Sequence, residues 1–505
     1  MVNQARLSFR FSAARPKFAF AAVGLFFAIL FAPCAAGYEI VGWGGQQPQS
    51  IPAASAVKIA AGFNYSLAIK SDGGIIGWGD NWSAQASPPA GNDFVALATG
   101  YRHSLAIKSD GTIVGWGYNG AARATPPAGN DFVAVAAGVS HSLALTSNGS
   151  IAGWGSNGLG QITLPEGNDF VAIAAGFNHS LALRSDGSIV VWGWGIAATP
   201  LEGNDFIAIA AGGWHNLALR SDGSISGWGA NWAEQATPPE GNDFVAVAAG
   251  DYYSLALKSD GSIVGWGDNR YGQATPPEGN DFIAIAAGAL HCLALQNTRP
   301  VAEAGPDQTV YALINGKAKV LLDGSDSTDA DGDVLTYKWR WRIGSGFCEA
   351  NGVNPEIELP SGVHTIKLIV NDGWRDSAPD DVNITVVAPL EGRLNITPSA
   401  INRRSNERHI LAVLRLPDGI GQRDIDEASP LLLYPGEINA SKRLIIPCVE
   451  RGRRFITIIA FFDKDALMAA APSNGIKTLK VGGKLKSGRY FFGADTVIIF
   501  DRRFK

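Results

Sequence analysis

The sequence predicts an all-β protein: a seven-bladed β-propeller followed by two immunoglobulin-like β-sandwich domains. A Trp-Gly pair and an Ala-Gly or Thr-Gly pair each recur seven times, at steps of 35 to 38 residues, a spacing typical of propellers and solenoids. Small and bulky apolar residues alternate within each copy, as in Phe244–Gly250 (FVAVAAG), which is the period of a strand. Short strand-like segments with turn signals predict the two sandwiches after residue 298.

One full repeat runs from Phe244 to Asp281. An Asp-Gly or Asn-Gly pair separates its second and third strand-like segments and tolerates the positive φ angles of a tight hairpin. Prolines in the last segment (Gln-Ala-Thr-Pro-Pro) fit an edge strand. We therefore expect each repeat to be one blade, an antiparallel sheet of three to four strands. The hairpin pair occurs six times, at Asp72-Gly73, Asp110-Gly111, Asn148-Gly149, Asp186-Gly187, Asp222-Gly223 and Asp260-Gly261.

The two ends of the repeat region are incomplete in complementary ways. The first repeat begins late, at Tyr38–Gly44 (YEIVGWG), and the last one ends early, at His291–Gln296 (HCLALQ). The N-terminal segment would supply the strand that the last repeat lacks, so that the ring closes and only short edges remain. The sequence thus predicts a propeller over residues 37–298, with a seventh blade made of roughly 244–296 plus 38–44.

The full motif A-A-G-x-x-H-S-L-A-L-x-S-D-G-x-I-x-G-W-G-x-N-x-x-G-Q resembles the regulator of chromosome condensation repeat family. It is also similar to the secreted bacterial propellers of the β-lactamase inhibitory protein type II kind. The resemblance covers about half of the chain and implies a propeller, while function does not follow from fold alone. One blade departs from the motif: around Trp192 the sequence VWGWGIAATP is two residues shorter and lacks the Asn-x-x-Gly-Gln segment.

Residues 1–36 have the features of a secretory signal peptide. Four basic residues precede an apolar run from Phe18 to Ala32, and Cys34-Ala35-Ala36 offers small residues at the cleavage positions. The alternative is an uncleaved membrane anchor, which would leave no linker before Tyr38. We expect cleavage after Ala36, no membrane span thereafter, and a location outside the cell or at its surface, with the periplasm as the other compartment.

Two further domains are expected. Residues 299–389 resemble the polycystic kidney disease (PKD) domain, an immunoglobulin-like sandwich, with inward-facing pairs such as Val320/Leu322 and Ile366/Leu368. Residues 390–505 contain several short strand-like segments and one short helix, Asp465–Ala471, and predict another β-sandwich.

Net charge differs between these parts. The propeller has nine Lys and Arg against 20 Asp and Glu, a charge of −11, whereas residues 390–505 have 20 against 12, a charge of +8. An acidic propeller repels phosphate backbones, which argues against nucleic acid as a partner. The basic excess of the third domain is explained either by an anionic polymer at the cell surface or by a solvated face.

An aspartate cluster lies in the predicted PKD-like domain. Carboxylates at alternate positions could hold calcium, although the spacing is not that of an EF-hand, because Arg340 stands where the bidentate glutamate would be. The other interpretation, in which no cofactor is bound, is a solvated turn whose side chains cap backbone groups. The candidate metal ligands are Asp323, Asp326, Asp329, Asp331 and Asp333.

The sequence does not predict an enzyme. Five of the seven histidines share one repeat position, which indicates a structural role, with each imidazole satisfying a loop backbone. No Gly-x-Ser-x-Gly, His-Glu-x-x-His or phosphate-loop motif is present. A polysaccharide-active enzyme, which needs only two carboxylates, is the alternative. Cys292 takes the place of a repeat serine and is expected to be a buried thiol.

Variation among the repeats marks a candidate ligand-binding face. The residues after each Ala-Gly and after each Trp-Gly vary and are rich in aromatics, and alternate connections of a meander emerge at one end. We expect a monomer that binds a protein or glycan ligand there, directly or as a glycan-binding accessory module. Packing of these aromatics between blades is the alternative. The candidate residues are Phe63, Trp82, Tyr101, Tyr118, Phe177, Trp214, Trp232, Tyr252 and Tyr271.

Overall fold

The computed structural model describes residues 37–45, 52, 55–195 and 201–502. The predicted signal peptide, residues 1–36, lies outside this range. Within the range, no helix has both the length and the apolar character needed to cross a membrane. Contacts divide the chain into two units, with the propeller and residues 329–333 in the first and the rest of both sandwich domains in the second.

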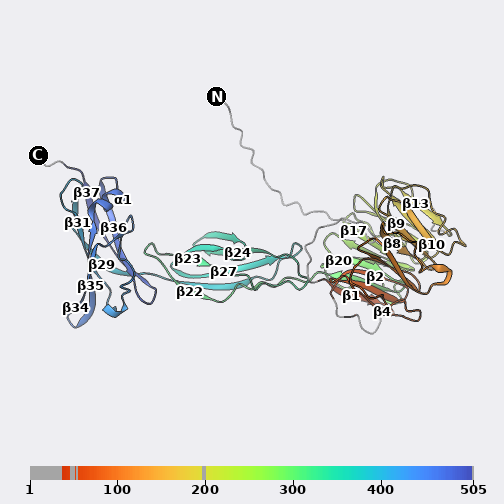
Figure 1. Cartoon of the computed structure of the whole chain (residues 1–505), viewed down its shortest axis with the longest axis horizontal. Coiled ribbons are helices and arrows are strands. Elements are labelled where there is room, and N and C mark those ends of the chain that lie inside the picture. The colour runs from red at the N-terminus through yellow and green to blue at the C-terminus, as the bar shows by residue number, and fades with distance from the viewer. Residues whose placement is uncertain (1–36, 46–51, 53–54, 196–200, 503–505) are drawn as a thin grey trace, which may run out of the picture. The chain divides into compact units, whose positions relative to one another are not determined.

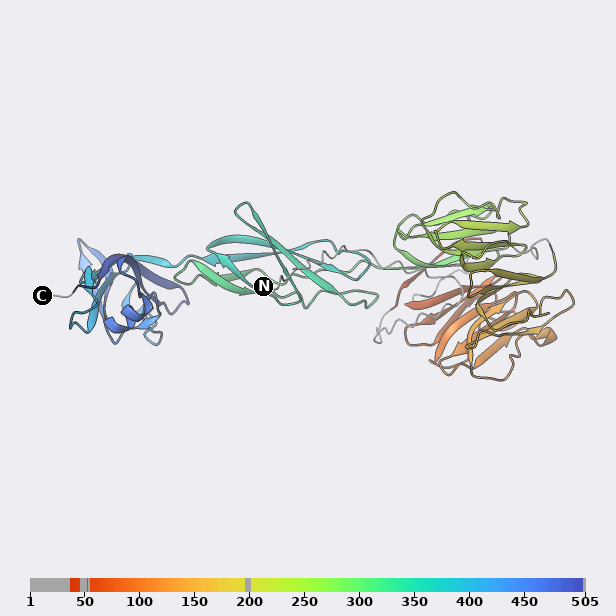
Figure 2. The same ribbon diagram turned by 90° about the horizontal axis from the view of Figure 1, so that it is seen from above.

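The propeller consists of seven antiparallel sheets of three strands, which follow one another from red to green in Figures 1 and 2. Six blades are formed by consecutive strands. Their bounds are β2 (Ala56–Ala61), β3 (Tyr65–Lys70) and β4 (Ile75–Gly79); β5 (Phe94–Thr99), β6 (His103–Lys108) and β7 (Ile113–Gly117); β8 (Phe132–Ala137), β9 (His141–Thr146) and β10 (Ile151–Gly155); β11 (Phe170–Ala175), β12 (His179–Arg184) and β13 (Ile189–Gly193); β14 (Phe206–Ala211), β15 (His215–Arg220) and β16 (Ile225–Gly229); β17 (Phe244–Ala249), β18 (Tyr253–Lys258) and β19 (Ile263–Gly267).

The seventh blade joins the two ends of the propeller. It contains β20 (Phe282–Ala287), β21 (His291–Gln296) and β1 (Glu39–Gly44), in the order β1-β21-β20. Trp43 of β1 lies opposite Cys292 of β21 in an antiparallel register. The shared blade begins at Phe282 and not near residue 244, as the repeat boundaries had predicted, because β17, β18 and β19 complete a blade of their own.

The alternation of small and bulky residues serves the packing between blades. The middle strand of every blade is buried along almost its whole length, because neighbouring blades cover both of its faces. Leu181 and Leu183 of one blade, for example, pack against Ile209 and Ala218 of the next. Leucine on one face and alanine on the other therefore allow adjacent sheets to approach closely.

Glycine is required at the hairpin turns. Gly111 has φ +82°, and a Cβ atom there would lie 2.1 Å from the carbonyl oxygen of Asn130. The following Gly-Asn-Asp loop therefore packs directly on the turn, and Phe132 N donates a hydrogen bond to Gly111 O over 3.2 Å. The hairpin turns and the Gly-Asn-Asp loops thus share one end of the propeller.

The second domain is a β-sandwich. A five-stranded sheet, in the order β22-β28-β27-β24-β25, accompanies a two-stranded sheet of β23 and β26. Val320, Leu322, Ile366 and Leu368 point inward as predicted and pack with the buried Trp339. The strands are β22 (Gln308–Tyr311), β23 (Lys317–Leu321), β24 (Thr336–Ile343), β25 (Gly346–Asn351), β26 (Glu356–Pro360), β27 (Gly362–Asn371) and β28 (Asp380–Val387).

The third domain contains nine strands in one hydrogen-bonded sheet, in which β30 pairs with β37 beside the main path β33-β32-β36-β37-β29-β31-β35-β34. Side chains from strands far apart in this order, such as Leu433 and Phe462, share one core, so the sheet folds over on itself. The strands are β29 (Leu390–Thr397), β30 (Ala400–Asn402), β31 (His409–Arg415), β32 (Leu432–Tyr434), β33 (Ile438–Asn439), β34 (Lys442–Glu450), β35 (Arg453–Asp463), β36 (Gly475–Lys484) and β37 (Tyr490–Phe500).

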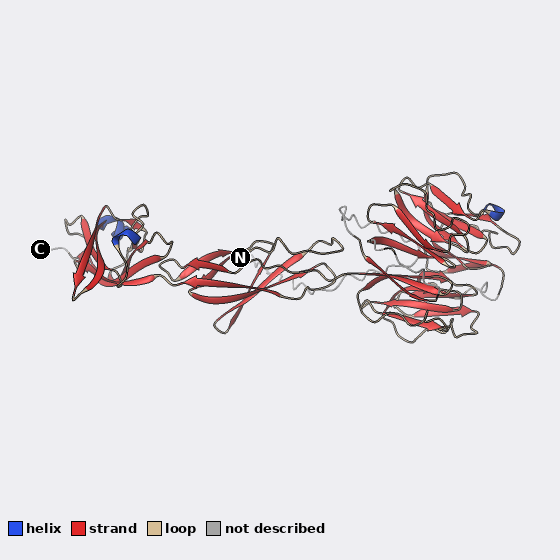
Figure 3. Ribbon diagram, turned by 90° about the horizontal axis from the view of Figure 1, so that it is seen from below, coloured by secondary structure: helices blue, strands red, loops and turns tan. Residues whose placement is uncertain are grey.

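Helix is rare in the described chain (Figure 3). The α-helix α1 (Lys464–Ala470) lies within one residue of the predicted helix, and the Asp463 side chain caps it by accepting a hydrogen bond from Ala466 N. The described residues also contain two 3₁₀ turns, η1 (Gly120–Ala122) and η3 (Gln422–Asp424). The predicted all-β fold class, a propeller followed by β-sandwich domains, is confirmed.

Candidate binding face

Two sets of loops emerge together at the end of the propeller opposite the hairpin turns. One set follows the Ala-Gly pairs and the other follows the Trp-Gly pairs, and we call them together the loop face. A backbone hydrogen bond joins the two loops within every blade. The bonds are Gly45 N to Leu290 O, Asp80 N to Asn64 O, Tyr118 N to Arg102 O, Ser156 N to Ser140 O, Trp194 N to Asn178 O, Ala230 N to Trp214 O and Asp268 N to Tyr252 O, all between 2.7 and 2.9 Å.

The loop that carries Trp82 is held in place by its own side chains. Asn81 Oδ1 accepts a hydrogen bond from Ala86 N, and Gln85 Oε1 accepts one from Ser83 N, each over 2.8 Å. The carbonyl oxygen of Gln85 in turn accepts hydrogen bonds from the side chains of Ser104 and Trp116 in the next blade. The loop is therefore anchored both to itself and to its neighbour.

The loop that carries Trp232 repeats this arrangement. Asn231 Oδ1 accepts from Ala236 N, and Gln235 Oε1 accepts from Ala233 N. Ser254 and Trp266 of the next blade donate to the carbonyl oxygen of Gln235. Asparagine and glutamine in the repeat motif thus fix the loops, and the tryptophan directly after the asparagine faces solvent.

The aromatic residues after the Trp-Gly pairs are exposed. Trp82 is 91% exposed and Trp232 is 72% exposed, while Tyr118, Trp194 and Tyr271 have exposed fractions near one half (48%, 54% and 54%). The alternative that these side chains pack between blades is therefore wrong for this set. Large exposed aromatics on ordered loops suit recognition of a partner.

The aromatic residues after the Ala-Gly pairs lie closer to the propeller axis and are partly buried. Several of them form ring contacts with one another or with the outer set. The pairs and their centroid distances are Phe63–Tyr101 at 4.3 Å, Phe177–Trp214 at 5.8 Å, Trp194–Trp214 at 6.1 Å and Trp232–Tyr252 at 6.3 Å. The structure thus places all nine predicted aromatics on the loop face and brings six of them into such pairs.

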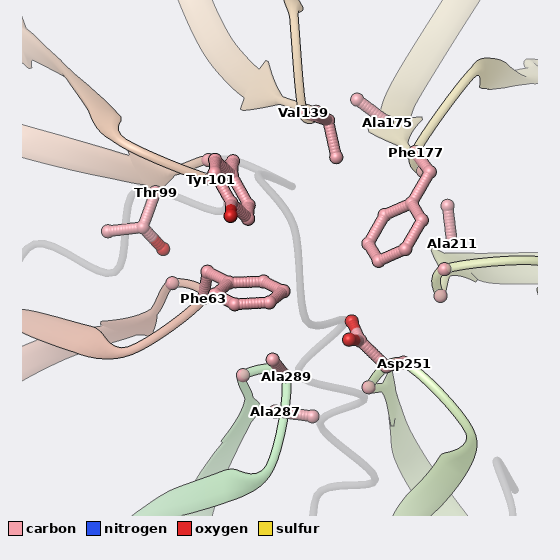
Figure 4. Close-up of a pocket in the computed structure, with 18 of the residues that line it drawn as sticks. Phe63, Thr99, Tyr101, Val139, Ala175, Phe177, Ala211, Asp251, Ala287 and Ala289 are labelled. Atoms are coloured by element: carbon pink, nitrogen blue, oxygen red, sulfur yellow. The ribbon is translucent and has the colours of Figure 1, made fainter. Parts of the chain in front are cut away.

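A small pocket of about 80 Å³ lies where the inner loops meet, and we call it the axial pocket. Small residues, mostly Ala and Gly, from all seven blades form its wall. The rings of Phe63, Tyr101 and Phe177 point into it, together with the Val139 side chain and the Asp251 carboxylate (Figure 4).

Asp251 is the chemically distinctive residue of this pocket. Burial raises the pKa of its carboxyl group to about 7. Among the residues that the structure describes, no hydrogen bond or ion pair reaches its carboxylate. The repeat pattern identifies this position only as variable, although Asp251 is the one charged residue there. The equivalent residues of the other blades are Phe63, Tyr101, Val139, Phe177, Gly213 and Ala289.

Glycines close the ring beneath the pocket. A Cβ atom at Gly138 would lie 2.4 Å from the carbonyl oxygen of Gly176 and 2.4 Å from Cε1 of His141. Neither the neighbouring blade nor the imidazole leaves room for a side chain. The repeated glycine therefore sets how closely the blades approach the axis.

The repeat histidines connect each blade to the next, and we call the set the histidine ring. Their partner is a side chain of the following blade and not a loop backbone, which corrects the expectation from the sequence. Tyr65 and Tyr253 continue the ring, and the Tyr253 hydroxyl donates to the carbonyl oxygen of His291. The Nε2 contacts are His103 with Ser142, His141 with Ser180, His179 with Asn216, His215 with Ser254 and His291 with Ser66, at 2.8 or 2.9 Å.

Burial lowers the pKa of these imidazoles, to about 3 for His103, His141 and His215 and to about 4 for His179 and His291. They are therefore neutral at neutral pH. Cys292 is buried and unpaired by disulfide, and burial raises the pKa of its thiol to about 12. Neutral imidazoles and a protonated thiol suit a structural role.

The aspartate cluster is brought together only in part. Carboxylate oxygens of Asp329, Asp331 and Asp333 lie within 4.8 Å of one another, an oxygen donor set that fits calcium chemistry. Asp331 also accepts hydrogen bonds from Thr298 N and Oγ1 at 2.5 and 2.7 Å. Asp323, which accepts from the backbone of the nearby Ser325, and the exposed Asp326 are not part of this group.

The propeller matches the family model described as the regulator of chromosome condensation (RCC1) repeat. Six segments match, at residues 56–83, 94–121, 132–161, 170–195, 206–231 and 244–273. These segments correspond to the six blades that are built from consecutive strands. No curated protein matches the chain.

Solved structures of low sequence identity are also similar to this chain. Prp20p from Saccharomyces cerevisiae is 18% identical, with 52% of this chain and 92% of that chain covered and a TM-score of 0.44. Human WBSCR16 is 19% identical, with 49% and 87% covered and a TM-score of 0.43. The ectodomain of the Arabidopsis thaliana receptor kinase ACR4 is 21% identical, with 44% and 83% covered and a TM-score of 0.38.

Proposed function

We propose that this chain is a secreted or cell-surface, non-enzymatic binding protein whose loop face holds a protein partner. The observation that carries the proposal is the exposure of Trp82 and Trp232 on loops fixed by hydrogen bonds. Rigid aromatic side chains contribute much contact area at a low cost in conformational entropy. The signal-like residues 1–36 support an extracellular or surface location.

The composition of the axial pocket favours binding over catalysis. Glycoside hydrolysis by the usual mechanism needs two carboxyl groups on either side of the scissile bond. Asp251 is the one acidic residue among those that line the pocket. The histidines, which are the other candidates for acid-base chemistry, are buried in contacts between blades.

A glycan is the second candidate partner. The Trp82 indole is almost fully exposed, and a flat exposed ring can stack on a sugar. We favour a protein, because the four aromatic contacts join seven rings into three clusters on the loop face. Clustered aromatic side chains are typical of the hot spots of a protein interface.

Differential capture tests the proposal. The full chain and a Trp82→Ala/Trp232→Ala variant are immobilised, and proteins shed from the surface of the producing cells are passed over both. A protein retained by the wild type and lost from the variant, at equal melting temperature, supports the loop face. Equal retention by both contradicts it. A glycan array probed with the same pair separates the second candidate from the first.

A further inference from the structure

The axial pocket combines three aromatic rings with a single carboxylate. Phe63, Tyr101 and Phe177 enter it from three blades, and Asp251 enters from a fourth (Figure 4). Its remaining lining is small or apolar apart from Thr99. The pocket therefore offers π-faces, one negative charge and no other charged group among its lining residues.

The carboxylate lacks a countercharge in its surroundings. Asp251 is one of the residues on which neighbouring blades disagree, and the equivalent positions are apolar or aromatic. Asp251 is half-buried, so its carboxylate loses part of its hydration, which is unfavourable without a partner, and the described residues provide no ion pair for it. A ligand with a positive charge would supply the missing partner.

The rings favour the same kind of ligand. Cations are attracted to aromatic faces within about 6 Å of the ring centroid, and the rings of Phe63 and Tyr101 lie 4.3 Å apart. Tyr101 already makes one such contact, since the Arg102 guanidinium carbon lies 5.3 Å from its centroid. An organic cation in the pocket would be attracted both by the faces of these rings and by the Asp251 carboxylate.

Other ligand classes fit less well. A hard metal ion needs several oxygen ligands, and the pocket lining has one carboxylate. A phosphate or carboxylate ligand would be repelled by Asp251. The volume of about 80 Å³ is roughly half that of an apolar cavity that binds benzene, about 150 Å³, so the group that enters is smaller than a ring.

We infer that the axial pocket binds an alkylammonium group, held by Asp251 and by the rings of Phe63, Tyr101 and Phe177. The inference deepens the proposed function, because the group would be a lysine side chain of the protein partner. A free quaternary amine offers the same chemistry, and the experiment distinguishes the two sources.

Binding of such a group should depend on pH. Because the pKa of Asp251 is about 7, its ionised fraction is small at pH 6 and large at pH 8, and the apparent affinity falls by roughly tenfold at the lower pH if only the ionised form binds. The titratable and charged groups nearby are Tyr253, whose pKa is raised by burial, His215, whose pKa is lowered to about 3, and Arg102 and Tyr101. Tyr253 and His215 therefore keep one charge state over this range.

Calorimetric titration of the full chain provides the test. Three probes are used: choline, Nα-acetyl-lysine methylamide, and 3,3-dimethylbutan-1-ol, which is the neutral isostere of choline. We expect the two cations to bind, with the lysine probe the tighter one, and the neutral isostere to bind at least tenfold more weakly. Tighter binding of choline would assign the site to a free quaternary amine and overturn the lysine assignment.

Variants test whether cation binding depends on the axial pocket and not on the rest of the loop face. Asp251→Asn should weaken cation binding at least tenfold, and Phe177→Leu, which keeps an apolar side chain without a π-face, severalfold. The matched control Glu278→Gln removes the same charge from an exposed position outside the pocket and should change nothing. Equal binding of the isostere, an unchanged Asp251→Asn variant, or no binding of either cation would overturn the inference. The probes need no partner, so this result is independent of the capture experiment.

Discussion

The Nε2 atom of His291 lies 2.8 Å from the Oγ atom of Ser66, so a side-chain hydrogen bond joins the last blade of the propeller to the first. The same kind of contact joins His141 to Ser180, which lies 39 residues after it in the sequence. Each contact is buried, and burial keeps each imidazole neutral at neutral pH. The ring is therefore closed by side chains as well as by the pairing of β1 with β21.

The histidine ring predicts a loss of stability in acid. The folded-state pKa values of about 3 to 4 lie below the unfolded value of about 6.5. The unfolded chain thus binds more protons at intermediate pH, and this contribution is complete above about pH 6.5 and is lost as the pH falls toward 3. Calorimetric melting from pH 8 to pH 4 measures it. His141→Gln should reduce the number of protons taken up on unfolding by about one, and an unchanged uptake would contradict the assignment.

Removal of β1 should open the propeller. Deleting residues 38–44 exposes the edge of β21, and exposed edges promote pairing with other chains. We expect a lower melting temperature and oligomers in sedimentation experiments. A synthetic peptide of residues 37–45, added in excess, should restore the monomer and part of the lost stability. A monomeric deletion variant with the melting temperature of the wild type would contradict this role of β1.

The exposed and the packed tryptophans should respond differently to truncation. Trp82→Ala should leave the free energy of unfolding almost unchanged, because the indole is 91% exposed. Trp116→Ala should cost about 3–5 kcal/mol, because the side chain packs against the core and donates a hydrogen bond to Gln85 O. Denaturant unfolding followed by circular dichroism measures both. A large loss for Trp82→Ala would place that side chain in the core.

The glycines that close the ring beneath the axial pocket should not tolerate a methyl group. Gly138→Ala places a Cβ atom 2.4 Å from a carbonyl oxygen and from the His141 ring, and overpacking of this kind costs about 1–3 kcal/mol. Gly158→Ala is the matched control, because nothing lies within 4 Å of its added Cβ. Thermal melting of the two variants should differ by several degrees. Equal melting temperatures would mean that the neighbouring blade and the His141 ring move to make room for the extra atom.

Calcium should raise the melting temperature of the full chain if it relieves repulsion among Asp329, Asp331 and Asp333, and we expect this result at millimolar concentration. The double variant Asp329→Asn/Asp333→Asn should lose the response. Asp323→Asn, outside the group, should keep it. No response of the wild type at constant ionic strength would leave these residues as caps of a turn.

The sequence predicted the propeller and its loop face because both follow from local patterns repeated in register. Alternation within seven copies gives the strands, and disagreement among copies marks the loops that carry Trp82 and Trp232. The histidine partner was missed, since Ser142 lies one repeat and one residue beyond His103, and only the stacking of blades brings them together.

Asp251 was missed for a related reason. Its neighbours Phe63, Tyr101 and Phe177 come from other blades, and their convergence depends on the closed ring. The single sheet of the third domain was likewise hidden, because β29 and β37 pair across about 100 residues of sequence. Local patterns identify strands and loops, whereas sites and sheet order depend on contacts over a long range.

The position of β1 has a consequence for how the protein is made. The strand is synthesised first among the propeller strands, yet its partner β21 follows about 250 residues later, which is roughly 10 to 50 s at ordinary rates of translation. Throughout that interval β1 has no sheet to join, and a chain interrupted before His291 lacks the strand that closes the ring. The last blade can therefore form only after the whole propeller has been synthesised.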